Sequence, residues 1–478
     1  MHQRTVLPAR TKFAYGIGQV AETIKGTGFD IFLFFYFTQV LGLSGTLAGV
    51  AVMIALVFDA VTDPLAGYVS DHWRSRYGRR HPFMVVAALP LAAAWFALFM
   101  PPESLSQMGL FFWLTGFAIL VRGAMTLYYV PYLALGAELT SDYQERTSVA
   151  AWRGVCGVLA AALVAVAGLS LFFPDSAEFE NGMLNPQGYP KVALAGSIIM
   201  ALAILFSAWG TRDRIASLPQ ASTSLARTPV REDIAAAWSN TSFRSLFLGT
   251  MLVAISIGIV QTLNMHLNVY FWQLSSSSIA FLAVGVLVGW PVGIMLAAPL
   301  HKRFDKKRTI IAAALIGPVA GNIAVVSRLA GVFPEQGSVL FVPLIFCVLF
   351  ASGVAAGLAM ISGASMMADV TQEHQFRTGR SQEGFLFSAV AFTGKLAAAV
   401  GYLVAGVGLD LIAFPVQAEP SQVSLAEVTR LALLNLSACL FGFASVCAYF
   451  FYNIDRARQE HTARSIAARD AVSSQVAP

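Results

Sequence analysis

Long apolar stretches alternate with short polar clusters along this chain. Cutting the sequence at the polar clusters leaves twelve apolar stretches, each near or above the ~20 residues that a helix needs to cross the hydrocarbon of a bilayer. The stretches are residues 13–41, 44–69, 83–101, 107–135, 149–173, 190–209, 244–273, 277–300, 308–329, 339–368, 384–409 and 429–453. The pattern predicts an all-α membrane protein with twelve transmembrane helices.

A weak internal repeat divides these stretches into two halves. Residues 63–80 end the second stretch and residues 290–307 end the eighth, and both run from an apolar helix through proline into a basic loop of equal length. Parallel halves of this kind are typical of two-domain transporters. The predicted parts are an N-terminal six-helix bundle (1–209), a polar cytoplasmic linker (210–243) with a short amphipathic stretch near 233–238, a C-terminal six-helix bundle (244–453) and a cytoplasmic tail (454–478).

Composition and charge place the chain in a membrane and orient it. Hydrophobic residues make up 57% of the 478 and charged residues 12%, against a charged share of ~25% in soluble domains. With both termini inside, the inner segments and the inner ends of the apolar stretches together hold 25 of the 31 basic residues, as expected for cytoplasmic loops. The net charge of +5 then indicates contact with anionic membrane lipid and not with nucleic acid. We expect a multi-pass protein of the cell (inner) membrane with cytoplasmic termini.

Two aspartates, Asp59 and Asp63, interrupt the second apolar stretch. Their spacing of four places both carboxylates on one face of a helix. A charge at the centre of a bilayer costs ~2.5 to 3.5 kcal/mol on insertion scales, so such acids usually meet a positive partner. The repeat puts Val286 and Trp290 at the same places in the second half. The pair therefore predicts a cation site and not a general folding element.

Other classes of function find little support in the sequence. The chain has no Gly-rich phosphate loop, no Gly-x-Ser-x-Gly, no HExxH and no CxxC, so neither an enzyme nor an ATP-driven pump is indicated. Its four cysteines lie in predicted helices at no metal-ligand spacing and are expected to pack. A transporter that works by alternating access accounts for the two-half pattern of helices better than a channel does. We predict no cofactor beyond a coupling ion, Na⁺ or H⁺.

Several motifs together resemble the glycoside-pentoside-hexuronide:cation symporters of the major facilitator superfamily, over essentially the whole chain. The motifs are Tyr15-Gly-Ile-Gly18, Tyr36-Phe-Thr-Gln-Val-Leu-Gly42, Asp59-Ala-Val-Thr-Asp-Pro64, Arg76-Tyr-Gly-Arg-Arg-His-Pro82, Val130-Pro-Tyr-Leu-Ala-Leu135, and Gly379-Arg-Ser-Gln-Glu-Gly384 followed by Lys395. The resemblance implies the major facilitator fold, with two pseudo-symmetric six-helix bundles, and symport of a small solute with a cation.

The resemblance also implies which residues hold the cation. In melibiose permease two second-span aspartates and a fourth-span threonine surround sodium beside an eleventh-span lysine, and the matching positions here are Asp59, Asp63, Thr126 and Lys395. Oxygen donors suit a small hard cation. The alternative is a buried ion-pair network that only fixes helix packing. The sequence leaves Na⁺ and H⁺ both open, because Arg122 lies one turn from Thr126 and could take the cation's place.

The solute site departs from the family. The two sugar-binding carboxylates of the family fall on Thr23 and Tyr129, so the solute is not expected to bind as melibiose does. Arg122 has two interpretations, as a clamp for an acidic solute group or as a counter-ion to an intramembrane acid. His266 is expected to pack within the bundle. The candidate solute-binding residues are Glu22, Thr23, Lys25, Asp30, Arg122, Tyr129, Tyr132, Gln261, Asn264 and Asn268.

Charged residues of the inner loops form a predicted gating network. They can bridge helix ends in one state and release them in the other, and they can also simply anchor the topology. The predicted members are Asp71, Arg76, Arg79, Arg80, Glu138, Arg146, Arg153, Asp369, Arg377 and Arg380.

Two further hypotheses share the fold. Sodium-dependent lysophospholipid carriers also keep the paired aspartates and the lysine, which makes an amphipathic lysolipid-like solute the alternative cargo. A non-transporting sensor on a transporter fold is a third possibility. The expected partners are a small-molecule solute and membrane lipid, with a monomer as the functional unit.

Overall fold

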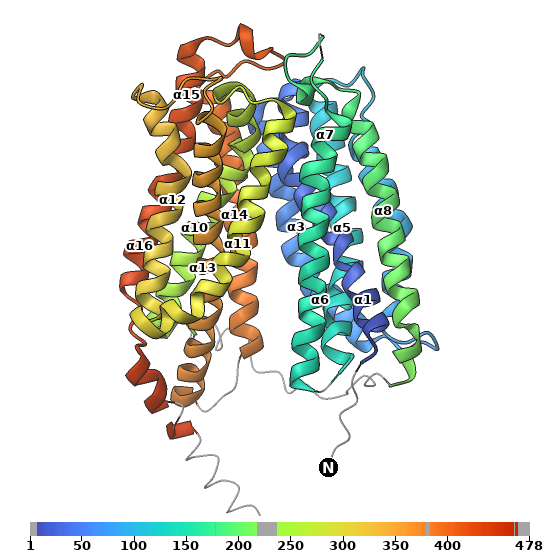
Figure 1. The fold of residues 1–478 in the computed structure, drawn as a ribbon. Coiled ribbons are helices and arrows are strands. Elements are labelled where there is room, and N and C mark those ends of the chain that lie inside the picture. The colour runs from blue at the N-terminus through green and yellow to red at the C-terminus, as the bar shows by residue number, and fades with distance from the viewer. Residues whose placement is uncertain are drawn as a thin grey trace, which may run out of the picture. The chain divides into compact units, whose positions relative to one another are not determined.

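The chain folds entirely into helices and loops in the computed structural model, which describes residues 7–140, 142–176, 178–217, 237–378, 383–462 and 464–466. No strand occurs in these ranges, and the ribbon in Figure 1 shows long helices joined by short loops. Residues 233–236 of the predicted amphipathic stretch near 233–238, and the predicted gating residue Arg380, lie outside the described residues.

The helices follow the predicted apolar stretches closely. They are α1 (Ala9–Ile17), α2 (Gln19–Gly28), η1 (Phe29–Leu33), η2 (Tyr36–Val40), α3 (Gly45–His72), α4 (His81–Leu98), α5 (Gln107–Glu138), α6 (Tyr143–Ala162), η3 (Leu163–Gly168), α7 (Leu169–Phe172), η4 (Gly182–Leu184), α8 (Gly188–Thr211), η5 (Arg212–Ser217), α10 (Thr241–His266), η6 (Leu267–Phe271), α11 (Ser276–Phe304), α12 (Lys306–Leu329), α13 (Phe341–Thr378), α14 (Glu383–Leu411), η7 (Pro420–Gln422), α15 (Leu425–Leu436) and α16 (Ala438–Phe450).

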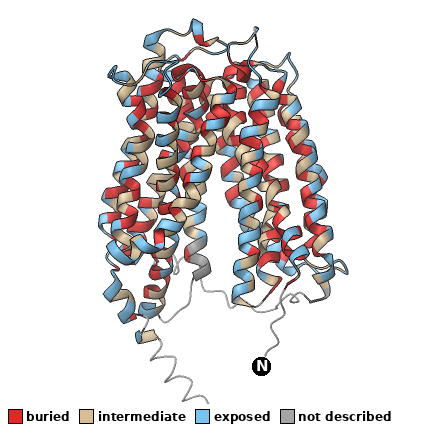
Figure 2. Cartoon of the chain, in the orientation of Figure 1, coloured by how far each residue is buried: buried red, intermediate tan, exposed pale blue. Residues whose placement is uncertain are grey.

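Eleven helices in the described ranges are long and apolar enough to cross a membrane. The predicted first span is different, because it is divided into α1, α2, η1 and η2. Exposed leucines such as Leu89, Leu171 and Leu202 indicate surfaces that face lipid, and Figure 2 shows exposed and buried positions alternating along the helices. The chain is a multi-pass integral membrane protein, and the predicted all-α fold is confirmed.

Packing divides the chain into two compact units. The first contains Met1–Ser224, Gln261–Ala283 and Tyr402–Leu434, and the second contains Leu225–Val260, Val284–Gly401 and Asn435–Pro478. In the first unit α3 and α4 both pack against α5, and in the second α12 packs against α13 and α16. The units depart from the predicted halves because α10, α11 and α14 each contribute residues to both. The predicted boundaries of the two bundles stay a prediction.

The first span is locally unwound into π-helical segments. η1 and η2 follow α2 directly, and such segments inside helices frequently occur at functional sites. Asp30 lies in η1. The side chain of Asp30 therefore projects from a part of the first span where regular helix geometry is interrupted.

One end of the first unit joins early and late segments of the chain. Gly45 and Gly49 of α3 lie so close to α14 that an added Cβ would come within 2.5 Å of Gly406 O or 2.9 Å of Tyr402 O. Asn181 Nδ2 donates to Leu274 O at 2.7 Å. The glycines of α3 thus allow the backbones of α3 and α14 to approach closely.

Candidate functional site

Asp59 and Asp63 lie in the middle of α3, as the spacing predicts. Ser44 caps this helix by accepting a hydrogen bond from the Leu47 N–H at 3.4 Å. Asp59 is buried at 7% exposure, whereas Asp63 is partly exposed. The acid pair is therefore held on a regular helix with one carboxylate in the protein interior.

Thr126 of α5 lies between the two carboxylates. Its Oγ1 is 3.0 Å from Asp59 Oδ1 and 2.9 Å from Asp63 Oδ1, and the side chain is buried. A hydroxyl has one hydrogen to donate, so it can satisfy only one of these contacts at a time. The carboxylate oxygen to which the hydroxyl does not donate still lies close to the hydroxyl oxygen. That contact is favourable only if one of the acids is protonated or if a cation lies among the three oxygens.

Arg122, one turn before Thr126, also contacts the acid pair. Its Nη1 is 3.4 Å from Asp59 Oδ2, and its guanidinium lies over the Phe29 ring at 5.3 Å from the centroid. The residue is 8% exposed. Among the described residues no group accepts a hydrogen bond from its buried Nε. Arg122 therefore neutralises Asp59 and still has one donor unused.

The charged residues of the first span are all paired. Lys25 Nζ lies 2.8 Å from Glu22 Oε1, so these two solute-binding candidates form an ion pair within α2. Asp30 Oδ1 accepts a hydrogen bond from the hydroxyl of Tyr402 in α14 at 3.1 Å. Tyr402 could not be identified from the sequence, because no spacing rule relates residues 372 positions apart.

A polar face of the first span adjoins α5 at Tyr129. The Tyr129 hydroxyl donates to Gln19 Oε1 at 3.2 Å, and Gln19 Nε2 donates to Thr23 Oγ1 at 3.5 Å. A Cβ added at Gly26, one turn after Glu22, would meet nothing within 4 Å. We call Gln19, Glu22, Thr23 and Gly26 the polar face of α2. Gln19 is absent from the predicted site, although its spacing of four from Thr23 could have suggested it.

Tyr132 has a structural place that argues against contact with solute. It is fully buried, its hydroxyl donates to Tyr15 O at 2.9 Å, and its ring stacks on Tyr15 with centroids 4.6 Å apart. Tyr128 donates in the same way to Gly18 O at 2.7 Å. These tyrosines fasten α5 to α1, so Tyr132 is a packing residue.

Polar residues of the predicted seventh span fall into two groups. Gln261, Asn264 and Asn268 are partly or fully exposed. His266 is instead fully buried, and its Nε2 lies 3.2 Å from Thr38 Oγ1. His266 therefore packs within the first unit, as expected, and the three amides are available to a solute.

Lys395 lies in α14 and is partly exposed. It belongs to the second compact unit, whereas Asp59, Asp63 and Thr126 belong to the first. Its participation in the cation site stays a prediction.

Four predicted gating residues of the N-terminal half form one network, namely Asp71, Arg79, Arg80 and Glu138. Arg80 is 3% exposed, and its Nη2 lies 2.5 Å from Asp71 Oδ1 and 2.8 Å from Glu138 Oε1. Its Nη1 donates to Ser70 Oγ at 2.7 Å. Arg79 Nη2 contacts the same Glu138 oxygen at 2.7 Å. The network thus ties the loop after α3 to the end of α5.

The remaining gating candidates are arranged separately. In the second unit Lys306 Nζ lies 2.6 Å from Asp369 Oδ2, and Arg377 Nη2 lies 2.9 Å from Glu373 Oε1. In the first unit Arg146 Nε donates to Thr140 O at 3.0 Å, Arg76 stacks on Tyr77, and Arg153 is partly exposed. Each of these contacts lies within one unit, and a bridge across the units stays a prediction.

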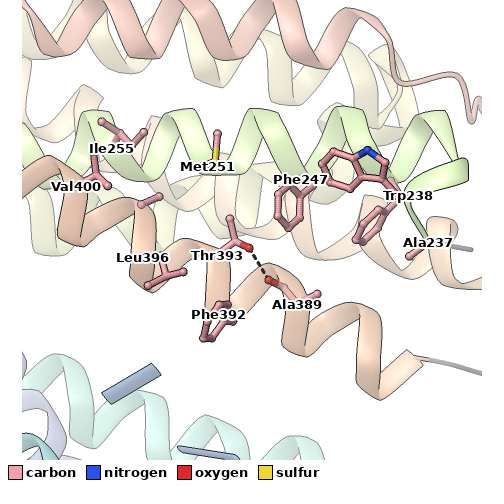
Figure 3. A pocket seen from close by; sticks show the side chains of 12 residues that line it. Ala237, Trp238, Phe247, Met251, Ile255, Ala389, Phe392, Thr393, Leu396 and Val400 are labelled. Carbon is pink, nitrogen blue, oxygen red and sulfur yellow. Dashed lines mark hydrogen bonds between the residues drawn. The ribbon is translucent and has the colours of Figure 1, made fainter. Parts of the chain in front are cut away.

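The second unit contains an apolar pocket of about 490 Å³ between α10 and α14. Figure 3 shows its lining residues, with Phe247, Met251 and Ile255 on α10 and Phe392 and Leu396 on α14. The described residues that line this pocket include no titratable side chain. It is therefore distinct in chemistry from the acid pair of the first unit.

Known proteins resemble the chain over nearly its full length. The sequence family described as MFS/sugar transport protein matches residues 14–456. The inner membrane symporter YicJ of Escherichia coli (strain K12) is 25% identical, over 94% of this chain and 93% of its own length. The putative glycoside/cation symporter YagG of the same organism is 25% identical, over 99% and 98%.

A solved structure supports the fold. The crystal structure of the nucleoside transporter NupG aligns with a TM-score of 0.62 over 94% of this chain and 100% of its own, at 14% identity. At that identity the likeness concerns the arrangement of helices alone.

Proposed function

The chain belongs to the MFS/sugar transport protein family, and from this premise we propose that it imports a sugar, glycoside or uronide by symport with Na⁺ or H⁺. The family consists of membrane transporters, so the function of this chain is transport and not catalysis. The relatives are named as symporters, one of them for glycosides and a cation. The cytoplasmic termini, the inner-membrane location, the contact with membrane lipid and the monomeric state are part of the same proposal.

The oxygen cluster of Asp59, Asp63 and Thr126 is the observation that carries the proposal. Both carboxylates lie within 3.0 Å of one hydroxyl oxygen. Two charges about 5 Å apart repel by about 3 kcal/mol at an effective dielectric of ~20. A bound cation or proton removes this repulsion, and hard oxygen ligands suit Na⁺. Lys395 is proposed as the charge partner on the family resemblance.

The coupling follows from linkage. A cation bound among the three oxygens orders α3 and α5, and α5 carries Tyr129, which contacts the polar face of α2. If the ordered arrangement binds solute more tightly, solute binding raises cation affinity by the same factor. The carrier with both cation and solute bound then changes most readily between its inward-open and outward-open states, and this coupling produces symport.

The polar face of α2 supports a hydroxyl-rich solute. Gln19, Thr23 and Tyr129 offer amide and hydroxyl groups, and Gly26 leaves space beside them. Gln261, Asn264 and Asn268 supply further amides that are at least partly exposed. Such groups can exchange their hydrogen bonds to water for hydrogen bonds to sugar hydroxyls.

A lysolipid-like solute is the second candidate. The pocket of about 490 Å³ in the second unit has an almost wholly apolar lining, which suits an acyl chain. The described residues that line it carry no charge to pair with a polar head group, whereas the oxygen cluster and the polar face of α2 support the sugar proposal.

A binding screen followed by transport assays tests the proposal. Purified protein is screened for thermal stabilisation by sugars, uronates and lysolipids with and without Na⁺ and across pH, because a bound ligand stabilises the folded state. The best solute is then measured in proteoliposomes with an imposed Na⁺ or pH gradient. We expect gradient-driven uptake that Asp59→Asn and Asp63→Asn each abolish.

Asp213→Asn is the matched control, since Asp213 is an exposed carboxylate remote from the oxygen cluster. Unchanged cation-dependent uptake in both aspartate variants would overturn the proposed cation site. Stabilisation by lysolipids alone would favour the second candidate.

A further inference from the structure

We propose that Arg122 is a tethered cation that pairs with Asp59 in the unloaded carrier and is drawn away by an acidic group on the solute, so that the solute of this carrier is an anionic sugar. The inference rests on the proposed function and specifies its substrate class. The acidic group is a carboxylate, a sulfonate or a phosphate, all of which a guanidinium recognises.

The contact between Arg122 and Asp59 is weak for a buried ion pair. A single nitrogen, Nη1, approaches a single oxygen at 3.4 Å, whereas charge-assisted hydrogen bonds between nitrogen and carboxylate are usually ≈ 2.7–2.9 Å. The Nε–H is buried and has no acceptor among the described residues. Leaving a buried donor without a partner costs about 1 to 3 kcal/mol, and more for a charged group. An arrangement of this kind favours a further acceptor.

A second buried arginine in the same unit provides an internal comparison. Arg80 uses all three of its nitrogens, with Glu138, Ser70 and Asp71 as partners at 2.5 to 3.2 Å. Arg80 has the partners of a structural arginine, and Arg122 does not. The difference indicates that Arg122 has room for a further partner beyond the residues that the structure describes.

The setting of Arg122 suits a two-point contact with an anion. The Phe29 ring, 5.3 Å from the guanidinium, restricts the guanidinium on one side. The unused Nε–H belongs to a planar fork that matches the two oxygens of a carboxylate or related group. Spacings of four and seven place Arg122, Thr126 and Tyr129 on one face of α5, and Tyr129 contacts the polar face of α2. An acidic sugar can therefore reach Arg122 while its hydroxyls meet that face.

This arrangement links cation and solute through one side chain. While Arg122 pairs with Asp59, it neutralises one of the two carboxylates that the coupling cation requires. An anion on the solute attracts the guanidinium and leaves Asp59 to the cation, with Asp63 and Thr126. A neutral solute offers no such attraction. Acidic solute and cation therefore raise each other's affinity, by the reciprocity of linkage.

The test compares matched acidic and neutral sugars on the full chain in lipid nanodiscs. The probes are methyl glycosides of hexoses, the corresponding uronides and their neutral methyl esters, with 6-sulfonate and 6-phosphate hexoses as separate arms that identify the acidic group. Calorimetry measures the affinity for Na⁺ and the protons exchanged on binding, with and without each probe. For the wild-type chain we expect an acidic member to bind about tenfold more tightly than its neutral counterpart, and to raise cation affinity by a similar factor.

Two arginine variants complete the test. Arg122→Gln is expected to abolish the preference for the acid and to raise cation affinity without solute by about tenfold, because the competing charge is removed. Arg122→Lys keeps the charge without the planar fork, so part of the preference remains. Arg244→Gln, at an exposed arginine of α10, is the control and should match the wild type.

Each possible result bears on the inference. A retained acid preference in Arg122→Gln, an unchanged or weaker cation affinity in that variant, or equal coupling by acidic and neutral probes in the wild type would overturn it. If Arg122→Gln does not fold, the wild-type comparison of probes and the Arg122→Lys variant still decide. The proposed function itself would fail if the wild-type chain bound no cation, or if its cation binding did not depend on Asp59 and Asp63.

Discussion

Asp410 caps the first turn of α3 from the end of α14: its Oδ1 accepts the backbone N–H of Gly45 at 2.9 Å. Its other oxygen accepts from the Thr46 N–H at 2.8 Å and from Ser44 Oγ at 2.6 Å. A carboxylate is favourable at a helix N-terminus because unpaired N–H groups and the helix dipole meet there. The contact joins segments 365 residues apart within the first unit.

Removing this cap should loosen the end of α3. A capping side chain contributes about 1 kcal/mol, so Asp410→Ala is expected to raise the population in which α3 and α14 separate by about fivefold. The measurement is the rate at which a cysteine introduced at Thr46 reacts with a membrane-impermeant maleimide. The faster reaction is expected in cells and in proteoliposomes alike.

A matched variant separates this effect from general destabilisation. Glu427 caps its own exposed helix start by accepting from the Ser424 N–H at 2.8 Å, so Glu427→Ala removes a cap without touching α3. Equal labelling rates in Asp410→Ala and the wild type would show that the cap does not hold the two helices together.

Thr126 should be required for its hydroxyl and not for its volume. Thr126→Ser keeps an oxygen near Asp59 and Asp63, whereas Thr126→Val has almost the same shape without it. We expect cation affinity to fall at least about tenfold in the valine variant and to stay within about threefold in the serine variant, since a ligand oxygen is lost only in the first. Calorimetry of cation binding provides the values.

The same helix offers a control for this prediction. Thr115 donates only to Phe111 O at 2.7 Å, so Thr115→Val removes a hydroxyl of α5 that has no contact with the acids. A cation affinity in Thr126→Val equal to that of Thr115→Val would mean that the hydroxyl is no ligand.

Arg80 should contribute strongly to stability. Arg80→Gln leaves Glu138, whose side chain is only 12% exposed, with fewer partners, and breaking a buried pair typically costs 3 to 5 kcal/mol. Asp71 is half exposed, so water can replace it and Asp71→Asn should cost about 1 kcal/mol or less. Thermal unfolding in detergent compares the two variants with Arg76→Gln, whose side chain stacks on Tyr77 at the surface. A smaller loss of stability in Arg80→Gln than in Asp71→Asn would contradict this account.

The sequence predicted the features that depend on short spacings. Hydropathy located the helices because each apolar stretch must span the same thickness of hydrocarbon, and a spacing of four placed Asp59 and Asp63 together. The Glu22–Lys25 ion pair follows from the same rule. Division of the first span into several helices was not predicted, since π-helical segments leave the hydropathy pattern unchanged.

Contacts between distant segments could not be derived in this way. Tyr402 beside Asp30 and Asp410 at the start of α3 both depend on how α14 packs within the first unit. Tyr132 is a predicted solute contact, yet burial against Tyr15 occupies its hydroxyl. The hydrogen bond from Tyr132 to Tyr15 joins segments 117 residues apart, which no spacing within one helix predicts.

Gly26 offers a direct test of whether solute lies along the polar face of α2. A Cβ at this position meets nothing within 4 Å, so Gly26→Leu should fold normally and gain slightly from the better helix propensity of leucine. If solute occupies this space, the added side chain should raise KM at least about tenfold while thermal stability is kept. Gly116→Leu on α5 is the matched control, because its added Cβ also meets nothing within 4 Å and its exposed position lies two turns from Arg122. Normal uptake by Gly26→Leu, with a KM equal to that of Gly116→Leu, would place the solute away from this face.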